Sequence, residues 1–150
     1  MTWLASLFLM FLLQTPPPSP KVTVGLEDGQ QVTIENPQFF GFIESSLGGA
    51  FLMYRQKDLH GQLPVSEISR IDFGRYERGQ PYPMNITLRS GQILPVVSEY
   101  RNYLMVRGKT DIGIVTIKYP DPISAPLRLS TKPPNRKKDL TIQYLEFPAS

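Results

Sequence analysis

The stretch FLMYRQKDLHGQLPV, residues 51–65, decides the predicted fold, because a similar stretch, YLMVRGKTDIGIVTI, returns at residues 103–117. Both contain an apolar and aromatic run, a polar turn that ends at a glycine, and a second apolar run. This pattern is typical of two short strands joined by a turn. Aligned without gaps, the stretches share the identical pairs Leu52 and Leu104, Met53 and Met105, Arg55 and Arg107, Lys57 and Lys109, and Gly61 and Gly113.

A second pair of similar segments precedes the first pair in both halves of the chain. LEDGQQVTI at residues 26–34 parallels LRSGQILPV at residues 88–96, with leucine, glycine and glutamine at matching positions. Asp28-Gly29 is among the strongest signals for a tight hairpin turn, because both central residues of such a turn need positive φ. Two blocks that keep their order in both halves predict an internal duplication.

The spacing of strands and turns predicts an all-β protein of two tandem small antiparallel β-barrel-like units, packed together, with few or no helices. The predicted divisions are a signal peptide and Pro-rich linker at 1–20, a first unit at 21–74, a linker at 75–83 and a second unit at 84–150. The first unit has an additional segment, ENPQFFGFIESSLGG, which is predicted to form an extra strand. The second unit has a basic loop, and the sequence DLTIQYLEF alternates as a final strand that pairs back onto one unit.

The first unit resembles small β-barrels of the Sm-like or SH3-like kind. The resemblance rests on Leu26, Asp28 and Gly29 in a Leu-x-Asp-Gly turn, and on Ile71 and Phe73 at the end of an Ile-x-x-Ile-x-Phe strand. It covers most of the first unit and, more faintly, the second. It implies an architecture only, because fold does not fix function. The positions with which Sm-like proteins contact nucleotides have no clear counterparts in this chain, so RNA binding is not implied.

The first 20 residues, MTWLASLFLMFLLQTPPPSP, contain no charged residue. Their apolar run from Trp3 to Leu13 is shorter than the roughly 20 residues of a membrane-spanning helix and fits the apolar region of a secretory signal peptide. The prolines after it favour an extended linker. The chain has no cysteine, which excludes disulfides and suits a bacterial envelope. The protein is predicted to be exported, periplasmic or secreted, with an uncleaved inner-membrane tether as the alternative.

Residues typical of catalytic sites are few and scattered. The only histidine, His60, falls in a predicted turn, and Ile112 takes its place in the second copy. The aspartates mostly fall where turns are expected, which is the ordinary use of that residue. The sequence contains no calcium loop, Gly-rich phosphate loop or nucleophile elbow. The protein is predicted to be no enzyme and to hold no cofactor or metal; a hydrolase with an unrecognised carboxylate site is an alternative.

Basic residues form the candidate polyanion-binding site. The net charge is +3 and the pI is about 9.2, which is too mild to require a nucleic-acid partner. The matched basic residues have two interpretations, contacts to an anionic polymer or solvent-facing positions that protect strand edges from aggregation. The candidate residues are Arg55, Lys57, Arg107, Lys109, Lys132, Arg136, Lys137 and Lys138.

An aromatic cluster, Phe39, Phe40 and Phe42, is predicted either to enter the core or, if exposed together, to form a partner-binding surface. The predicted function is that of an exported, non-enzymatic structural or interaction module of the bacterial envelope. It would bind protein or polymer through strand edges or this aromatic patch. A polyanion-binding or nucleic-acid-binding small barrel is the alternative. The sequence leaves the ligand and the oligomeric state open.

Overall fold

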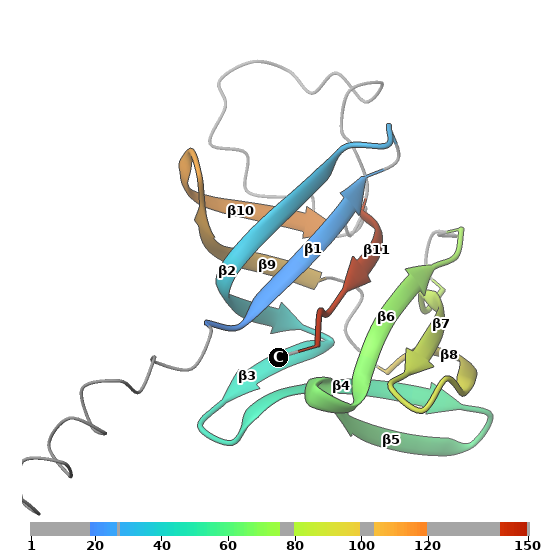
Figure 1. Cartoon of the computed structure of the whole chain (residues 1–150). Coiled ribbons are helices and arrows are strands. Elements are labelled where there is room, and N and C mark those ends of the chain that lie inside the picture. Colours follow the sequence, from blue (N-terminus) through green and yellow to red (C-terminus); the bar gives the residue numbers. More distant parts are fainter. Residues whose placement is uncertain (1–18, 27, 76–79, 100–103, 120–141, 150) are drawn as a thin grey trace, which may run out of the picture.

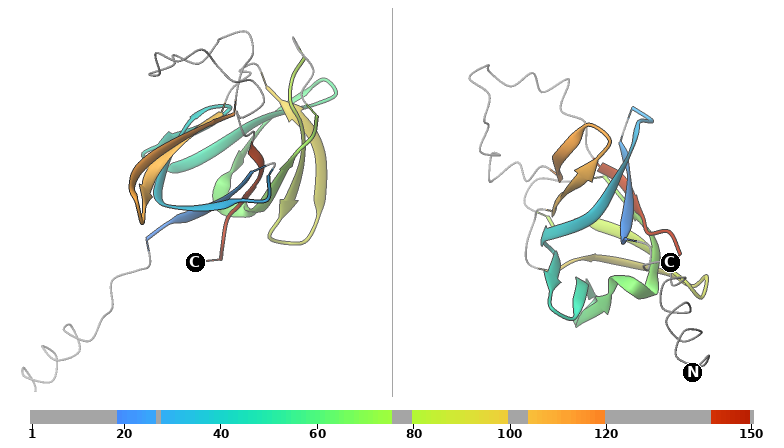
Figure 2. Two further views of the ribbon diagram at one scale, coloured as in Figure 1. Left: turned by 90° about the horizontal axis from the view of Figure 1, so that it is seen from above. Right: turned by 60° about the vertical axis from the view of Figure 1, so that its left-hand side comes forward.

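The computed structural model describes residues 19–26, 28–75, 80–99, 104–119 and 142–149. These residues form one large antiparallel β-sheet that curls into a half-barrel (Figures 1 and 2). A single 3-10 turn, η1 (Val65–Glu67), interrupts these strands. The strands are β1 (Lys21–Leu26), β2 (Gln31–Gly41), β3 (Ile43–Ser46), β4 (Gly49–Gln56), β5 (Leu59–Pro64), β6 (Ile68–Phe73), β7 (Pro83–Leu88), β8 (Ile93–Ser98), β9 (Leu104–Thr110), β10 (Gly113–Tyr119) and β11 (Ile142–Glu146).

One continuous sheet takes the place of the two predicted barrel units. Its strand order is β10-β9-β2-β1-β11-β6-β7-β8-β4-β3, and β5 pairs with β4. The hairpins form as predicted, but each finds its further partners in the other half of the chain. Strand β2 pairs with β9, β4 with β8, β6 with β7, and β11 with both β1 and β6. The predicted units therefore share their sheet, and the final strand lies in its middle.

The two predicted glycine turns have the same geometry. In the β1–β2 turn the Gly29 N–H donates to the Leu26 carbonyl oxygen at 3.0 Å, and in the β7–β8 turn the Gly91 N–H donates to the Leu88 carbonyl oxygen at 2.9 Å. Both glycines have positive φ, +85° and +91°. This is a conformation that L side chains rarely adopt, so the residue type follows from the turn. The sequence prediction of these two hairpins is confirmed.

The matched glycines of the opening stretch do not occupy equivalent turns, contrary to the prediction. Gly113 ends the β9–β10 turn with φ +115°, but Gly61 lies within β5, opposite Tyr54. The β4–β5 turn falls earlier, and Lys57 itself adopts φ +53° there. Gly61 is needed for a different reason: a Cβ at this position would lie 2.2 Å from Cζ of the Tyr54 ring.

The additional segment of the first half bends the sheet. Strand β2 pairs with β9 as far as Gly41, and β3 pairs with β4 from Ile43 onward. Gly41 has φ +108°, and the carbonyl oxygen of the intervening Phe42 accepts a hydrogen bond from the Met53 N–H at 2.8 Å. Strand β3 follows β2 directly in the chain. Starting from β2, neighbouring strands pair in the order β1, β11, β6, β7, β8, β4 and β3, so the sheet curls back to the chain segment from which it started. The predicted extra strand is confirmed.

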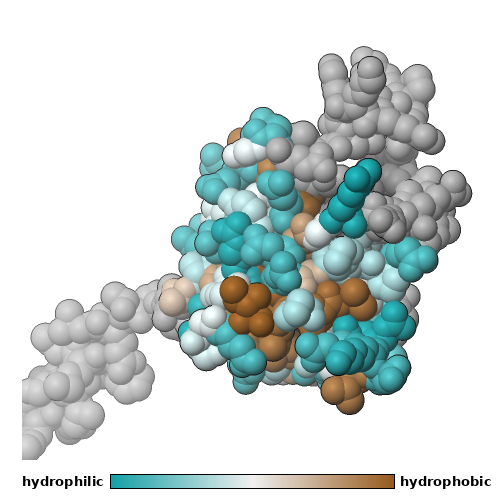
Figure 3. Space-filling view, turned by 90° about the vertical axis from the view of Figure 1, so that its right-hand side faces the viewer, coloured by the Kyte–Doolittle hydropathy of each residue, from teal (hydrophilic) through white to brown (hydrophobic). Residues whose placement is uncertain are grey.

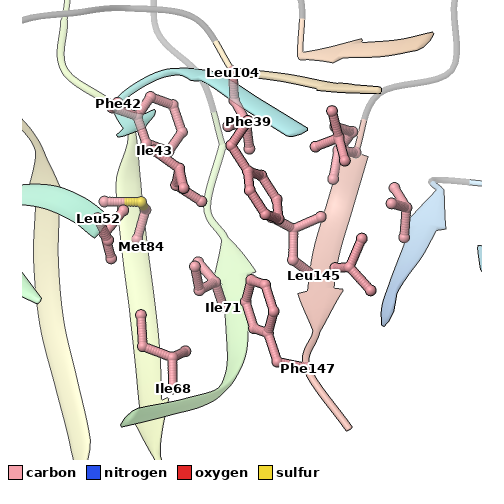
Figure 4. Packing of buried hydrophobic residues seen from close by; sticks show 14 of the residues in the cluster. Phe39, Phe42, Ile43, Leu52, Ile68, Ile71, Met84, Leu104, Leu145 and Phe147 are labelled. Carbon is pink, nitrogen blue, oxygen red and sulfur yellow. The ribbon is translucent and has the colours of Figure 1, made fainter. Parts of the chain in front are cut away.

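The core lies inside this curl and draws side chains from both halves of the chain (Figure 4). Phe42 packs against Phe73 and Tyr82, with ring centroids 6.1 and 6.0 Å apart. Phe39 packs against Phe147, with centroids 6.1 Å apart. With no cysteine in the chain, burial of such groups and the strand pairing have to stabilise the fold.

Gly108 marks a place where strands β9 and β2 approach closely. A Cβ there would lie 2.4 Å from Cγ2 of Ile34, which is fully buried, and 2.7 Å from the Glu35 carbonyl oxygen. We expect Gly108→Ala to lower the free energy of unfolding by about 1–3 kcal/mol, because neither neighbour is free to withdraw. Urea unfolding measures the change. The control is Gly48→Ala, whose Cβ would have no neighbour closer than 4.0 Å; equal losses in both variants would contradict the expectation.

Candidate functional site

Strand β10 forms one end of the sheet and pairs, among the described strands, only with β9. Its half-buried Val115 and Ile117 pack against the core, whereas Ile112 in the preceding turn and Ile114 are 84% and 69% exposed. Natural edge strands are usually blocked by charges or proline. Residues 113–117 contain neither, whereas β5, the strand beyond β4, ends at Pro64. Among the described strands, β10 therefore presents an edge without charge or proline along residues 113–117, although Lys118 follows within the strand.

The aromatic cluster divides between the core and the surface. Phe39 and Phe42 are 4% and 1% exposed, so in this fold they do not reach a partner, whereas Phe40 is 42% exposed. Phe40 stands opposite Met105, which stands opposite Lys118 of β10. Because side chains alternate along a strand, Ile114 lies on the same outer face as Phe40. One exposed aromatic residue thus lies on the same outer face as Ile114, on β2, which β9 separates from β10.

Two of the predicted basic residues, Arg55 and Lys57, line a groove of about 440 Å³ on the outer face of β4, β7 and β8. Prolines and other apolar residues, among them Pro83, Pro95 and Val97, form most of the remaining wall, and none of the described lining residues is acidic. On the side of the molecule where β7 and β8 lie, apolar surface gathers between hydrophilic areas (Figure 3). The groove combines an apolar wall with positive charge.

The other described basic candidates, Arg107 and Lys109, are exposed and project from one face of β9. Lys109 stands opposite Glu35, whose carboxylate also lies 3.8 Å from Lys21 Nζ. Strands β4 and β9 do not pair with each other, so the two matched basic pairs belong to separate parts of the sheet. Lys132, Arg136, Lys137 and Lys138 lie outside the described residues.

His60 lies in β5, and not in the turn where the sequence predicts it, and its Nδ1 forms a hydrogen bond with Oε1 of Glu99. The Glu99 side chain is only 12% exposed, and its Oε2 has no hydrogen-bond partner among the described residues. Sequence reasoning missed this pair, because 39 residues separate its members and no local pattern joins them.

The remaining acidic residues do not gather around His60. Asp28 accepts a hydrogen bond from the Gln30 N–H at 2.9 Å within its own turn, and Asp58 lies in the β4–β5 turn. Asp111 lies in the β9–β10 turn, and Asp121 is outside the described residues. In the described part of the chain, no group of three or more His, Asp and Glu side chains is placed to hold a metal ion.

Arg70 ties β6 to β11 on the outer face. Its guanidinium carbon lies 3.9 Å from the centre of the Tyr144 ring, and its Nε donates to Asp72 Oδ1 at 2.9 Å. Partial burial lowers the pKa of Arg70, but the hydrogen bond to Asp72 and the charges of Asp72 and Glu146 outweigh it and raise the pKa above its ordinary value. Arg70 thus stays charged and stabilises the contact between β6 and β11.

Within the described ranges, no helix is long and apolar enough to cross a membrane. No protein-family model, curated protein or solved structure matches this chain. Its own surface features therefore have to indicate what it binds.

Proposed function

We propose that this protein is an exported, non-enzymatic interaction module of a bacterial envelope, and that it binds a partner protein at the β10 edge. The observation that carries the proposal is the open edge of β10 with Ile114 exposed beside it. In strand addition, an extended partner segment satisfies the free backbone groups, and neighbouring side chains provide specificity. Ile114, on the edge strand itself, is an apolar contact of the required kind.

Export rests on the sequence. The uncharged, apolar first 20 residues and the absence of cysteine support an envelope location. N-terminal sequencing of the protein recovered from its producing cell tests this part. Material that begins at Met1 or Thr2 in the soluble cytoplasmic fraction would contradict export.

Site-specific photo-crosslinking tests the binding edge. A crosslinking amino acid at Thr116, which is exposed on β10, is expected to give a discrete protein adduct in envelope extract. The same group at Thr33, exposed on β2, is the control and is expected to give none. Ile114→Lys should lower adduct yield about tenfold, the cost of one lost apolar anchor.

Two outcomes would contradict the β10 proposal: equal adducts at positions 116 and 33, or a yield that Ile114→Lys leaves unchanged. The polyanion alternative predicts a different result. Binding through Arg55, Lys57, Arg107 and Lys109 would fall steeply as salt is added, whereas apolar strand addition is much less sensitive to salt.

We also propose that the sheet arose by duplication of one half. From the middle of the sheet outward, one side has the strand order β11-β1-β2-β9-β10 and the other side has β6-β7-β8-β4-β5. In this comparison β11 corresponds to β6, the β1–β2 hairpin to the β7–β8 hairpin, and the β9–β10 hairpin to the β4–β5 hairpin. The shared turn geometry of Gly29 and Gly91 supports the relation, as does complete burial of the matched Leu52 and Leu104. An experimental structure in which the two halves do not superpose by a rotation about the β6–β11 seam would contradict it.

A further inference from the structure

A groove of about 660 Å³, here called the terminal groove, lies where both ends of the described chain meet the sheet. Residues 19–21 and 147–149 line it together with parts of β2, β3, β4 and η1. Its volume falls within the range of small-molecule sites, about 300–1,000 Å³. The terminal groove is distinct from the β10 edge, so ligand binding in it is independent of the proposed function.

The inner wall of the terminal groove is apolar. Phe39 and Phe147, nearly buried and in ring contact, form its deepest part. The half-buried Ala50 and Val65, which pack against the core, continue this wall. An apolar chain laid along these four residues would leave water without straining the fold, and each methylene buried is worth about 0.8 kcal/mol.

A positioned cation stands at the rim of this wall. The Arg89 guanidinium donates through Nε to the Ser66 carbonyl oxygen at 2.9 Å, and through Nη2 to the Phe147 and Pro148 carbonyl oxygens at 3.1 and 3.3 Å. These acceptors are uncharged. These hydrogen bonds fix the orientation of Arg89, and no carboxylate of a described residue lies within 4.0 Å to compensate its charge.

The other charged group of the groove points to the same ligand chemistry. Lys21 adds a second positive charge, partly offset by Glu35 at 3.8 Å, and none of the described residues that line the groove is acidic. Arg89 Nη1 makes no hydrogen bond to a described residue and is available to a ligand. Among the described residues, Arg89 is the one cation of the groove without a carboxylate partner, and a single cation beside an apolar wall suits one negative charge on an apolar chain, rather than a polyanion.

We infer that the terminal groove binds an amphipathic carboxylate, a medium-chain fatty acid. The acyl chain lies along Phe39, Phe147, Val65 and Ala50, and the carboxylate accepts hydrogen bonds from Arg89. Charge-assisted bonds from a guanidinium to a carboxylate are among the strongest in proteins, which makes the head group the source of specificity. The chain supplies affinity through burial.

Calorimetric titration of the full-length protein with decanoate, below its micelle concentration, tests the inference. Decanol keeps the tail without the charge, and butyrate keeps the charge with a short tail. We expect saturable 1:1 binding of decanoate, at least about tenfold tighter than that of decanol, since a hydrogen bond to a charged group is worth about 1.5–3 kcal/mol. Butyrate should bind too weakly to measure. Absent decanoate binding, or equal binding of decanol, would overturn the inference.

Variants locate the binding. Arg89→Gln should weaken decanoate about tenfold and leave decanol unchanged, because it removes the charge that only decanoate uses. Ala50→Met fills the apolar wall without touching Arg89 and should weaken both ligands. Arg107→Gln, exposed on β9, is the matched charge control and should change neither. If Arg89→Gln does not fold, the Ala50→Met variant and the comparison of decanoate with decanol test the inference instead. Unchanged decanoate binding in a folded Arg89→Gln variant, or in Ala50→Met, would overturn the inference.

Discussion

Ending the chain after residue 141 is expected to abolish cooperative folding. The shortened chain lacks β11, which lies between β1 and β6 and is the only described strand that joins them. It also lacks Ile142, Leu145 and Phe147, all buried in the core. Each such side chain is worth about 2–5 kcal/mol, and a typical domain has a total stability of about 5–15 kcal/mol. Near-UV circular dichroism during urea or thermal unfolding measures the loss.

Two further variants show that the effect belongs to the strand. Removing only Ser150 should change the free energy of unfolding by less than about 0.5 kcal/mol, because the preceding Ala149 is exposed and the Pro148 peptide carbonyl that Arg89 contacts is kept. Leu145→Ala should lose about 2–5 kcal/mol and still unfold in one step. A chain ending at residue 141 that unfolds cooperatively at the full-length midpoint would show that β11 is dispensable.

Phe42→Ala is expected to lower the free energy of unfolding by about 3–5 kcal/mol. Phe42 is completely enclosed where β2 passes into β3, and it contacts the rings of Phe73 and Tyr82. Its removal opens a cavity at the point where the sheet bends back on itself. Denaturant unfolding of the purified variant measures the change.

Phe40→Ala is the matched control, two residues away in the same segment. Phe40 is 42% exposed, so its loss should cost less than about 1 kcal/mol. These two variants test the two interpretations of the aromatic cluster. The Phe42 substitution should lower stability, whereas the Phe40 substitution should affect only binding at the outer face of the sheet. Similar stability losses in both variants would mean that Phe40 is also a core residue.

Local features of the fold can be predicted from the sequence, but strand partners cannot. The Gly29 and Gly91 turns follow from residue type, because positive φ restricts the choice at those positions. The final strand follows from the alternation in DLTIQYLEF. That β2 pairs with β9, and β4 with β8, depends on contacts between distant segments that leave no periodic signal. The sequence therefore predicts two tandem units where the hairpins in fact exchange partners.

The candidate site is less predictable than the fold. Arg55 and Arg107 match between the halves of the sequence, yet they lie on strands that do not pair. Arg89 lies in the repeated segment 88–96 but is not one of its matched positions, and only its contacts to three carbonyl oxygens reveal its position at the terminal groove. Gly61 resembles a turn glycine in the sequence, but glycine is required there because the ring of Tyr54, across the hairpin, leaves no room for a Cβ. Such roles arise from tertiary contacts.

The central place of β11 also sets the order of events during protein synthesis. Strand β1 ends at Leu26 and β11 begins at Ile142, so a ribosome making about 5–20 residues per second needs roughly 6–23 s to go from one to the other. During this time the emerging hairpins can form, but the facing edges of β1 and β6 remain without the strand that separates them. Until β11 has been made, the nascent chain thus carries two unpaired strand edges, and its yield in a cell should depend on chaperones that cover them.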